Sequence, residues 1–240
     1  MRRPRRLVTL RDRDGAVVAA TRDDRRLAVL DDKRNAIVDL ATGSALPLRG
    51  RAQGCPRDWQ MAEFSRDGSA LVGAALCGQA LAWDGRTGTV ANRLDVRAEI
   101  GGLAVAPRGD VVALASEDGR LTLWDRRTGA RRVIGTSRGV DSLAFSGDGN
   151  SLVSGGIDRT IRVIDARSGR LLRTMRVQNP VYVRFGGDGH TLISSELHGV
   201  IRLWQTCPHC GDARALLAEA KGIVTRNLTP TERQTYLSGF

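Results

Sequence analysis

The stretch VVALASEDGRLTLWD, from Val111 to Asp125, is repeated along the chain with a period of about 40 residues. It aligns with SLVSGGIDRTIRVID at residues 151–165 and with TLISSELHGVIRLWQ at residues 191–205. A fourth copy spans residues 70–84, and a degenerate fifth copy spans residues 26–39. Because each copy joins two alternating apolar runs through a short polar turn, the repeat predicts paired β-strands with no helix between them.

The spacing of the copies indicates the architecture. The anchor positions Val38, Trp83, Trp124, Ile164 and Trp204 are separated by 45, 41, 40 and 40 residues. A period near 40 with Trp-Asp endings is typical of the four-stranded blades of a β-propeller. An Asp-x-x-Thr/Ser-Gly turn follows the anchor at residues 84–88, 125–129 and 165–169. The predicted fold class is therefore all-β, a propeller of about five degenerate four-stranded blades.

These repeats resemble the WD-repeat (WD40) family over residues 6–206. The family often carries a Ser–Asp–Trp–His hydrogen-bond network within a blade. Ser154 with Asp158, and Asp118 with Trp124, match parts of that network, but its histidine is missing from every copy. The resemblance implies that residues 1–206 form a propeller domain that binds other macromolecules without catalysis.

The number of blades leaves three explanations open. Seven blades would need about 290 residues, whereas five account for residues 1–206. The chain could form a closed five-bladed ring, an open arc completed by another chain, or the remnant of a longer protein. Residues 5–10 align with the outer strand at residues 131–134, which favours the arc or the remnant. An incomplete ring would expose sheet edges and lead to self-association.

Residues 207–240 are predicted to form a separate tail that packs on the propeller. Asp212 is a candidate N-cap for a short helix ending at Lys221, and residues 229–232 form a capping box for a second helix. Cys207-Pro-His-Cys210 and residues 224–233 resemble the tail of actinobacterial WD-repeat signalling and regulatory proteins. That resemblance implies a sensor or interaction domain in a bacterial signalling complex.

Cys207 and Cys210 are the candidate metal ligands of the chain. Structural zinc takes four ligands, and a single Cys-x-x-Cys pair supplies two of them. The sequence therefore favours a structural thiol pair over a metal or redox site, and no cofactor is expected. Cys55 and Cys77, the other two cysteines, are expected to be ordinary thiols.

The charge of the chain suggests nucleic acid only weakly. The formal net charge is +11, and 35 of the 37 basic residues are arginines spread through all the repeats close to acidic residues. This pattern favours a solvated surface of mixed sign, and a nucleic-acid-associated propeller is the alternative. No apolar run approaches the 18 residues needed to span a membrane, so a cytoplasmic protein is expected.

The sequence contains no set of residues with the pattern of a catalytic site. Residues 135–139 match the pattern G-x-S-x-G, but that motif requires a strand–turn–helix in an α/β sheet, whereas here it joins two predicted blades. The sequence has three histidines and no Gly-rich phosphate-binding loop, so few residues are available to form an active site. A propeller enzyme is therefore the less favoured alternative to a scaffold.

A protein partner is expected to bind the loops between strands on one rim of the propeller, because such loops vary without disturbing the core. The residues predicted for this rim are Glu117, Asp118, Arg138, Asp158, Gln178, Asn179, Glu196 and His198. Trp59 lies outside the repeated tryptophan position, and it is a second candidate for an exposed contact.

Overall fold

The computed structural model describes residues 17–31, 35–50, 52, 55, 59–136, 139–179, 181–186, 191–196 and 199–205. The chain divides into two compact units, Met1–Gln205 and Thr206–Phe240. The second unit, with the predicted helices and the Cys207–Cys210 pair, lies outside the described residues, as do residues 5–10.

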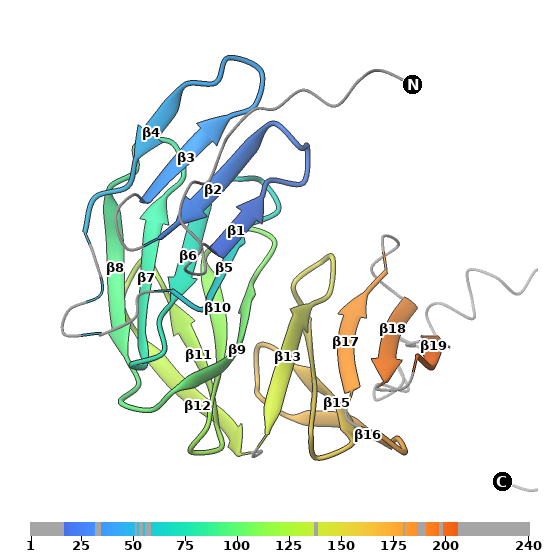
Figure 1. Cartoon of the computed structure of the whole chain (residues 1–240). Helices are drawn as coiled ribbons and strands as arrows, with labels where there is room; N and C mark the ends of the chain where they lie inside the picture. The colour runs from blue at the N-terminus through green and yellow to red at the C-terminus, as the bar shows by residue number, and fades with distance from the viewer. Residues whose placement is uncertain are drawn as a thin grey trace, which may run out of the picture. The chain divides into compact units, whose positions relative to one another are not determined.

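Every described element is a β-strand, and the strands form five antiparallel sheets (Figure 1). The first sheet contains β1 (Val17–Ala20), β2 (Arg26–Leu30), β3 (Asn35–Asp39) and β4 (Ala45–Pro47). The second contains β5 (Met61–Phe64), β6 (Ala70–Ala74), β7 (Gln79–Asp84) and β8 (Val90–Asp95). The third contains β9 (Ile100–Val105), β10 (Val111–Ser116), β11 (Arg120–Asp125) and β12 (Arg131–Thr136).

The last two sheets continue the same meander. The fourth contains β13 (Val140–Phe145), β14 (Ser151–Gly156), β15 (Thr160–Asp165) and β16 (Leu171–Arg176). The fifth contains β17 (Val181–Phe185), β18 (Thr191–Glu196) and β19 (Ile201–Gln205), so three of its strands are described. The first strands of consecutive sheets lie next to one another in the order β1, β5, β9, β13, β17. The five predicted blades are thereby confirmed.

The repeated turn after the third strand is built as the sequence predicts. In the third sheet, Asp125 Oδ1 accepts hydrogen bonds from the backbone N–H groups of Arg127 (2.9 Å) and Thr128 (2.8 Å). Gly129 follows with φ +79°, a conformation that glycine adopts without strain. The Thr128 amide is the largest contribution that lowers the pKa of Asp125. This aspartate therefore fixes where β11 ends and β12 begins.

Apolar clusters fill the spaces between successive sheets. Trp83 and Trp124, the anchors of the second and third sheets, are completely buried. Trp83 packs with Leu30 of the first sheet, and Trp124 packs with Val72 of the second. Two further clusters join the third sheet to the fourth and the fourth to the fifth. Since burying one large apolar side chain stabilises a fold by about 1.5–3 kcal/mol, these contacts hold neighbouring sheets together.

The hydrogen-bond network within the blades is only partly present. Trp124 Nε1 and Ser154 Oγ are buried without a hydrogen-bond partner in the described part of the chain. In the fifth sheet, Trp204 Nε1 donates to Ser194 Oγ at 2.8 Å. The third sheet has Leu114 at the position of Ser194, and the fourth has Ile164 at the position of Trp204, so each lacks one member of this pair. A buried polar group left unpaired costs about 1–3 kcal/mol, which weakens individual blades without changing their topology.

Two expectations from the sequence are wrong in this structure, and both concern the second sheet. Cys55 and Cys77 form a disulfide that closes a 22-residue separation, whereas ordinary thiols were expected. Trp59 is 8% exposed and meets Trp83 edge-to-face, with ring centroids 5.2 Å apart. It also lies over Gly73, where an added Cβ would come within 2.9 Å of the Trp59 ring. Trp59 is therefore part of the core and not an exposed contact.

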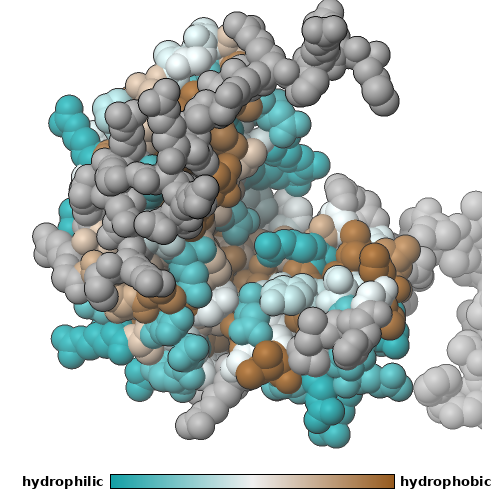
Figure 2. Space-filling view, viewed as in Figure 1, coloured by the Kyte–Doolittle hydropathy of each residue, from teal (hydrophilic) through white to brown (hydrophobic). Residues whose placement is uncertain are grey.

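The third strand of the fifth sheet is more exposed than its counterparts. Ile201 and Leu203 of β19 are 68% and 72% exposed, whereas the corresponding Ile161 and Val163 of β15 are buried beneath the fifth sheet. Figure 2 shows hydrophobic surface on the side of the molecule where this sheet lies.

Candidate functional site

The predicted partner-binding residues lie at the turn between second and third strands, or at the connection from a fourth strand to the next sheet. In antiparallel sheets these positions fall on the same side. Glu117, Asp118 and Gln178 are exposed, and Asp158 and Asn179 are half-buried. We call the surface formed by residues 75–78, 117–119, 139–141, 157–159 and 178–179 the loop rim.

Three of the predicted residues do not contribute to this described surface. Glu196 is buried and is paired with Arg202 of β19, so it is not accessible to a partner. Its backbone N–H also donates to the carbonyl of Val200 at 2.8 Å, which closes the β18–β19 turn. Arg138 and His198 lie outside the described residues.

Carboxylates from two neighbouring sheets influence one another on the loop rim. Partial burial raises the pKa of Asp141, and the negative charges of Asp158 and Glu117 raise it further. The turn that carries Glu117 is fixed because its backbone N–H donates to the carbonyl of Glu99 at 2.8 Å. Glu117, Asp141 and Asp158 are therefore close enough on the rim for their charges to interact.

Arginines from the same sheets neutralise two of the rim carboxylates. Asp118 accepts from Ser116 Oγ at 2.7 Å and from Arg120 Nη1 at 3.0 Å, and the Ser116 hydroxyl is the main cause of its lowered pKa. Asp158 pairs with Arg162 Nη1 at 2.5 Å. These pairs fix the orientation of the two carboxylates within their turns.

Apolar side chains lie beside the rim carboxylates. Ile157 is 63% exposed, and Leu76 is 36% exposed at the equivalent place in the β6–β7 turn. Ile157 packs over Gly139, where an added Cβ would lie 2.2 Å from Ile157 Cγ1. Gly139 has φ +69°, so both its conformation and the close contact require glycine. The rim thus presents an exposed apolar side chain that is held against Gly139 and is next to Asp158 in the same turn.

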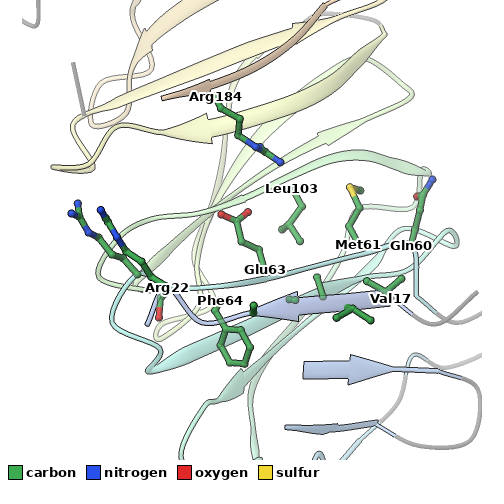
Figure 3. A pocket seen from close by; sticks show the side chains of 14 residues that line it. Val17, Arg22, Gln60, Met61, Glu63, Phe64, Leu103 and Arg184 are labelled. Atoms are coloured by element: carbon green, nitrogen blue, oxygen red, sulfur yellow. The ribbon is translucent and has the colours of Figure 1, made fainter. Parts of the chain in front are cut away.

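A second candidate site lies along the first strands of the sheets. A cavity of about 500 Å³ lies between β1, β5, β9 and β17, which is within the range of small-molecule sites. Its charged lining residues are Arg22, Glu63, Arg66 and Arg184, and its apolar lining includes Leu103 (Figure 3). We call this space the inner cavity.

Glu63 and Arg184 face each other in the inner cavity from different sheets (Figure 3). Burial raises the pKa of Glu63 from 4.5 to about 7, although the positive charge of Arg184 and the backbone N–H of Val105 act in the opposite direction. Arg184 Nη1 donates to the carbonyl of Leu143 at 2.7 Å. Glu63 is therefore protonated in a substantial fraction of molecules near neutral pH.

Sequence reasoning missed the inner cavity, although the repeat carries a signal for it. Glu63 and Arg184 occupy the next-to-last position of the first strand in their sheets. The other three sheets have alanine at that position, namely Ala19, Ala104 and Ala144, all of them buried. A charged residue in place of a buried alanine marks a place where the strand lines a cavity.

Some other kinds of site are not found in the described part of the chain. Its His, Cys, Asp and Glu residues form no group of three or more that could hold a metal ion. Within the same residues there is no helix of the length and apolarity required to cross a bilayer.

The five sheets and their order define the protein as a β-propeller. Residues 103–188 match the family model described as the WD40 domain of anaphase-promoting complex subunit 4. This match covers the third and fourth sheets and the start of the fifth, and the fold is a WD40-type propeller.

Two individual proteins illustrate the similarity. Over 114 residues the chain is 30% identical to the periodic tryptophan protein 2 homolog of Schizosaccharomyces pombe, a match that covers 45% of this chain and 13% of that protein. The crystal structure of the Cps50 (Swd1) β-propeller domain of Myceliophteria thermophila superimposes with a TM-score of 0.70 at 20% identity. That match covers 82% of this chain and 66% of the other. The chain thus spans a small part of the curated relative, and the likeness to the solved domain shows the fold.

Proposed function

We propose that this chain is a non-catalytic interaction platform that binds a protein partner on its loop rim. The observation that carries this proposal is the exposed Ile157, whose backbone N–H hydrogen-bonds Asp141, a carboxylate that also feels the charges of Asp158 and Glu117. WD40 propellers generally mediate protein–protein interactions, and binding sites commonly occupy loops held by a rigid scaffold. An apolar anchor next to carboxylates fits a partner segment that carries both apolar and basic side chains.

The tail resemblance noted in the sequence leads us to place this platform in a bacterial signalling or regulatory complex. A cytoplasmic location is part of the same proposal. In that compartment the Cys55–Cys77 pair is expected to be reduced for most of the time. Rapid alkylation of thiols in cell extracts, followed by mass spectrometry, would measure the fraction that is oxidised.

The test of the platform is affinity capture with matched variants of the full chain. The double change Ile157→Glu and Asp158→Arg alters the apolar anchor and the charge of the loop rim. Arg167→Glu changes an exposed charge in the β15–β16 turn on the opposite side and serves as the control. Partners retained by wild type and by the control, but lost by the double variant, would support the proposal.

The same experiment can contradict the proposal. If the double variant is folded by circular dichroism and captures the same proteins as wild type, the loop rim is not the binding surface. If the chain instead retains nucleic acid, with retention that falls steeply as salt increases, the nucleic-acid alternative is favoured.

Self-association is a second candidate function, and the exposed Ile201 and Leu203 of β19 favour it. We propose that a second copy covers these side chains. Light scattering would then give a mass above 25.9 kDa that returns to the monomer value in the Ile201→Ser, Leu203→Ser double variant. A monomeric wild-type chain would contradict this part of the proposal.

A further inference from the structure

The inner cavity contains charged groups that the loop-rim proposal does not use. Glu63 and Arg184 come from sheets that are far apart in the sequence, and both replace an alanine of the repeat. Both side chains face the same space. In the described structure no guanidinium nitrogen of Arg184 lies within 4 Å of a carboxylate oxygen of Glu63, so the two do not form an ion pair. A charged pair held apart across a cavity leaves room for a ligand group between the two side chains.

The charge of the lining indicates the kind of ligand. Arg22, Arg66 and Arg184 contribute three positive charges, whereas Glu63 contributes at most one negative charge. The remainder of the lining is largely apolar and includes Val17, Met61 and Leu103. An anion with a short apolar body fits this combination better than a cation does, because guanidinium groups donate to carboxylates in a fixed planar geometry.

We propose that the inner cavity binds a carboxylate-bearing ligand, which Arg184 holds through charge-assisted hydrogen bonds and which lies against the Glu63 side chain. The carboxylate belongs either to an acidic side chain of a bound polypeptide or to a small free dicarboxylic acid. This site is separate from the loop rim, so the inference does not depend on the proposed partner.

The protonation of Glu63 gives the site a pH dependence with a defined sign. The charged residues that line the cavity with Glu63 within the described residues are Arg22 after β1, Arg66 after its own strand and Arg184 on β17, whereas β9 contributes the apolar Leu103. Of these, Arg184 is the group whose charge acts on Glu63. Because ionised Glu63 repels a carboxylate, affinity falls as pH rises. With a pKa of about 7, the protonated fraction falls about tenfold between pH 6 and pH 8.

The test is isothermal titration calorimetry of the full chain with succinate and, separately, with an acetylated and amidated Gly-Glu-Gly peptide. At least one probe is expected to bind, with about tenfold lower affinity at pH 8 than at pH 6. Binding of succinate alone would identify a free dicarboxylate as the source, and binding of the peptide alone would identify a polypeptide side chain.

Variants separate the two roles. Glu63→Gln is expected to retain binding and to lose the pH dependence, because the amide is a hydrogen-bond donor at every pH. Arg184→Gln is expected to weaken binding at least tenfold, and Arg184→Lys to recover part of the loss. Arg173→Gln, which alters an exposed arginine of β16 outside the cavity, serves as the matched control and leaves binding unchanged.

Three results would overturn the inference. One is the absence of binding by either probe at 20 mM. Another is an affinity for either carboxylate probe that rises with pH, which would show that the bound carboxylate does not lie against Glu63. The third is equal affinity of wild type and a folded Arg184→Gln variant.

Discussion

Replacing Glu63 with glutamine should change how the stability of the fold depends on pH. In the folded chain burial raises the pKa of Glu63 from 4.5 to about 7. Between these two values the folded state keeps a proton that the unfolded state releases. The stability of the wild-type protein therefore falls as pH rises from about 4.5 to about 7, as far as this residue is concerned.

The size of the effect follows from the two pKa values. Each unit of difference is worth about 1.4 kcal/mol, so the rise to about 7 corresponds to a loss of about 3 kcal/mol between pH 4.5 and pH 8. Glutamine has almost the same shape, accepts the hydrogen bond from the Val105 amide and does not titrate. The free energy of unfolding of Glu63→Gln, minus that of wild type, should therefore increase by about 3 kcal/mol across this range.

The assay is urea unfolding of both proteins at half-unit intervals of pH, with m-values compared to check that the denatured states are alike. Asp125→Asn is a control of opposite sign, because its carboxylate has a lowered pKa in the folded state. That group stabilises the fold above its unfolded pKa of 3.8 and loses its effect below that value, so Asp125→Asn should differ from wild type by a constant amount from pH 4.5 to pH 8 and should converge with it at lower pH. A difference between Glu63→Gln and wild type that stays within about 0.5 kcal/mol from pH 4.5 to pH 8 would refute the raised pKa of Glu63 in the inner cavity.

Three further predictions concern stability. Reducing the Cys55–Cys77 disulfide, or replacing Cys77 with serine, should lower the free energy of unfolding by about 3 kcal/mol, the value expected for a loop of this length. Equal melting temperatures with and without reductant would contradict the pairing. Trp83→Ala should cost about 3–5 kcal/mol in urea unfolding, since the side chain is fully buried, and a cost below about 1 kcal/mol would contradict its place in the core. Gly156→Ala should destabilise the fourth sheet by about 1–3 kcal/mol, because the new Cβ would lie 1.8 Å from the Gly139 carbonyl oxygen. Gly135→Ala, with no atom within 4 Å of the new Cβ, is the matched control and should be near neutral.

The fold could be predicted from the sequence because the spacing of the repeats, the alternation of apolar residues and the turn motifs all indicate the same structure. The repeat places Trp83 and Trp124 at equivalent positions, and both are completely buried. The aspartate that follows each anchor forms the expected turn, as at Asp125. These features depend on contacts within a blade, which are local in sequence, so alternation and turn chemistry are sufficient to identify them.

The candidate sites could be predicted less well, because they depend on contacts between blades. Glu117 and Asp118 lie on the loop rim as expected, but Glu196 is buried and pairs with Arg202 of the same sheet, which the repeat alone did not indicate. The inner cavity requires Glu63 and Arg184 to line the same space from sheets that are more than a hundred residues apart in the sequence. The substitution of a charged residue for alanine at the same blade position indicates that these residues are unusual, but it does not show what they face.

The most direct test of the central claim is hydrogen–deuterium exchange of the chain alone and in complex with a captured partner. Binding on the loop rim predicts slower exchange in the partner complex at residues 117–119 and 157–159, with no change in the opposite turns at residues 84–88 and 165–169. Slower exchange confined to the opposite turns, with the rim unchanged, would contradict the assignment of the loop rim as the binding surface.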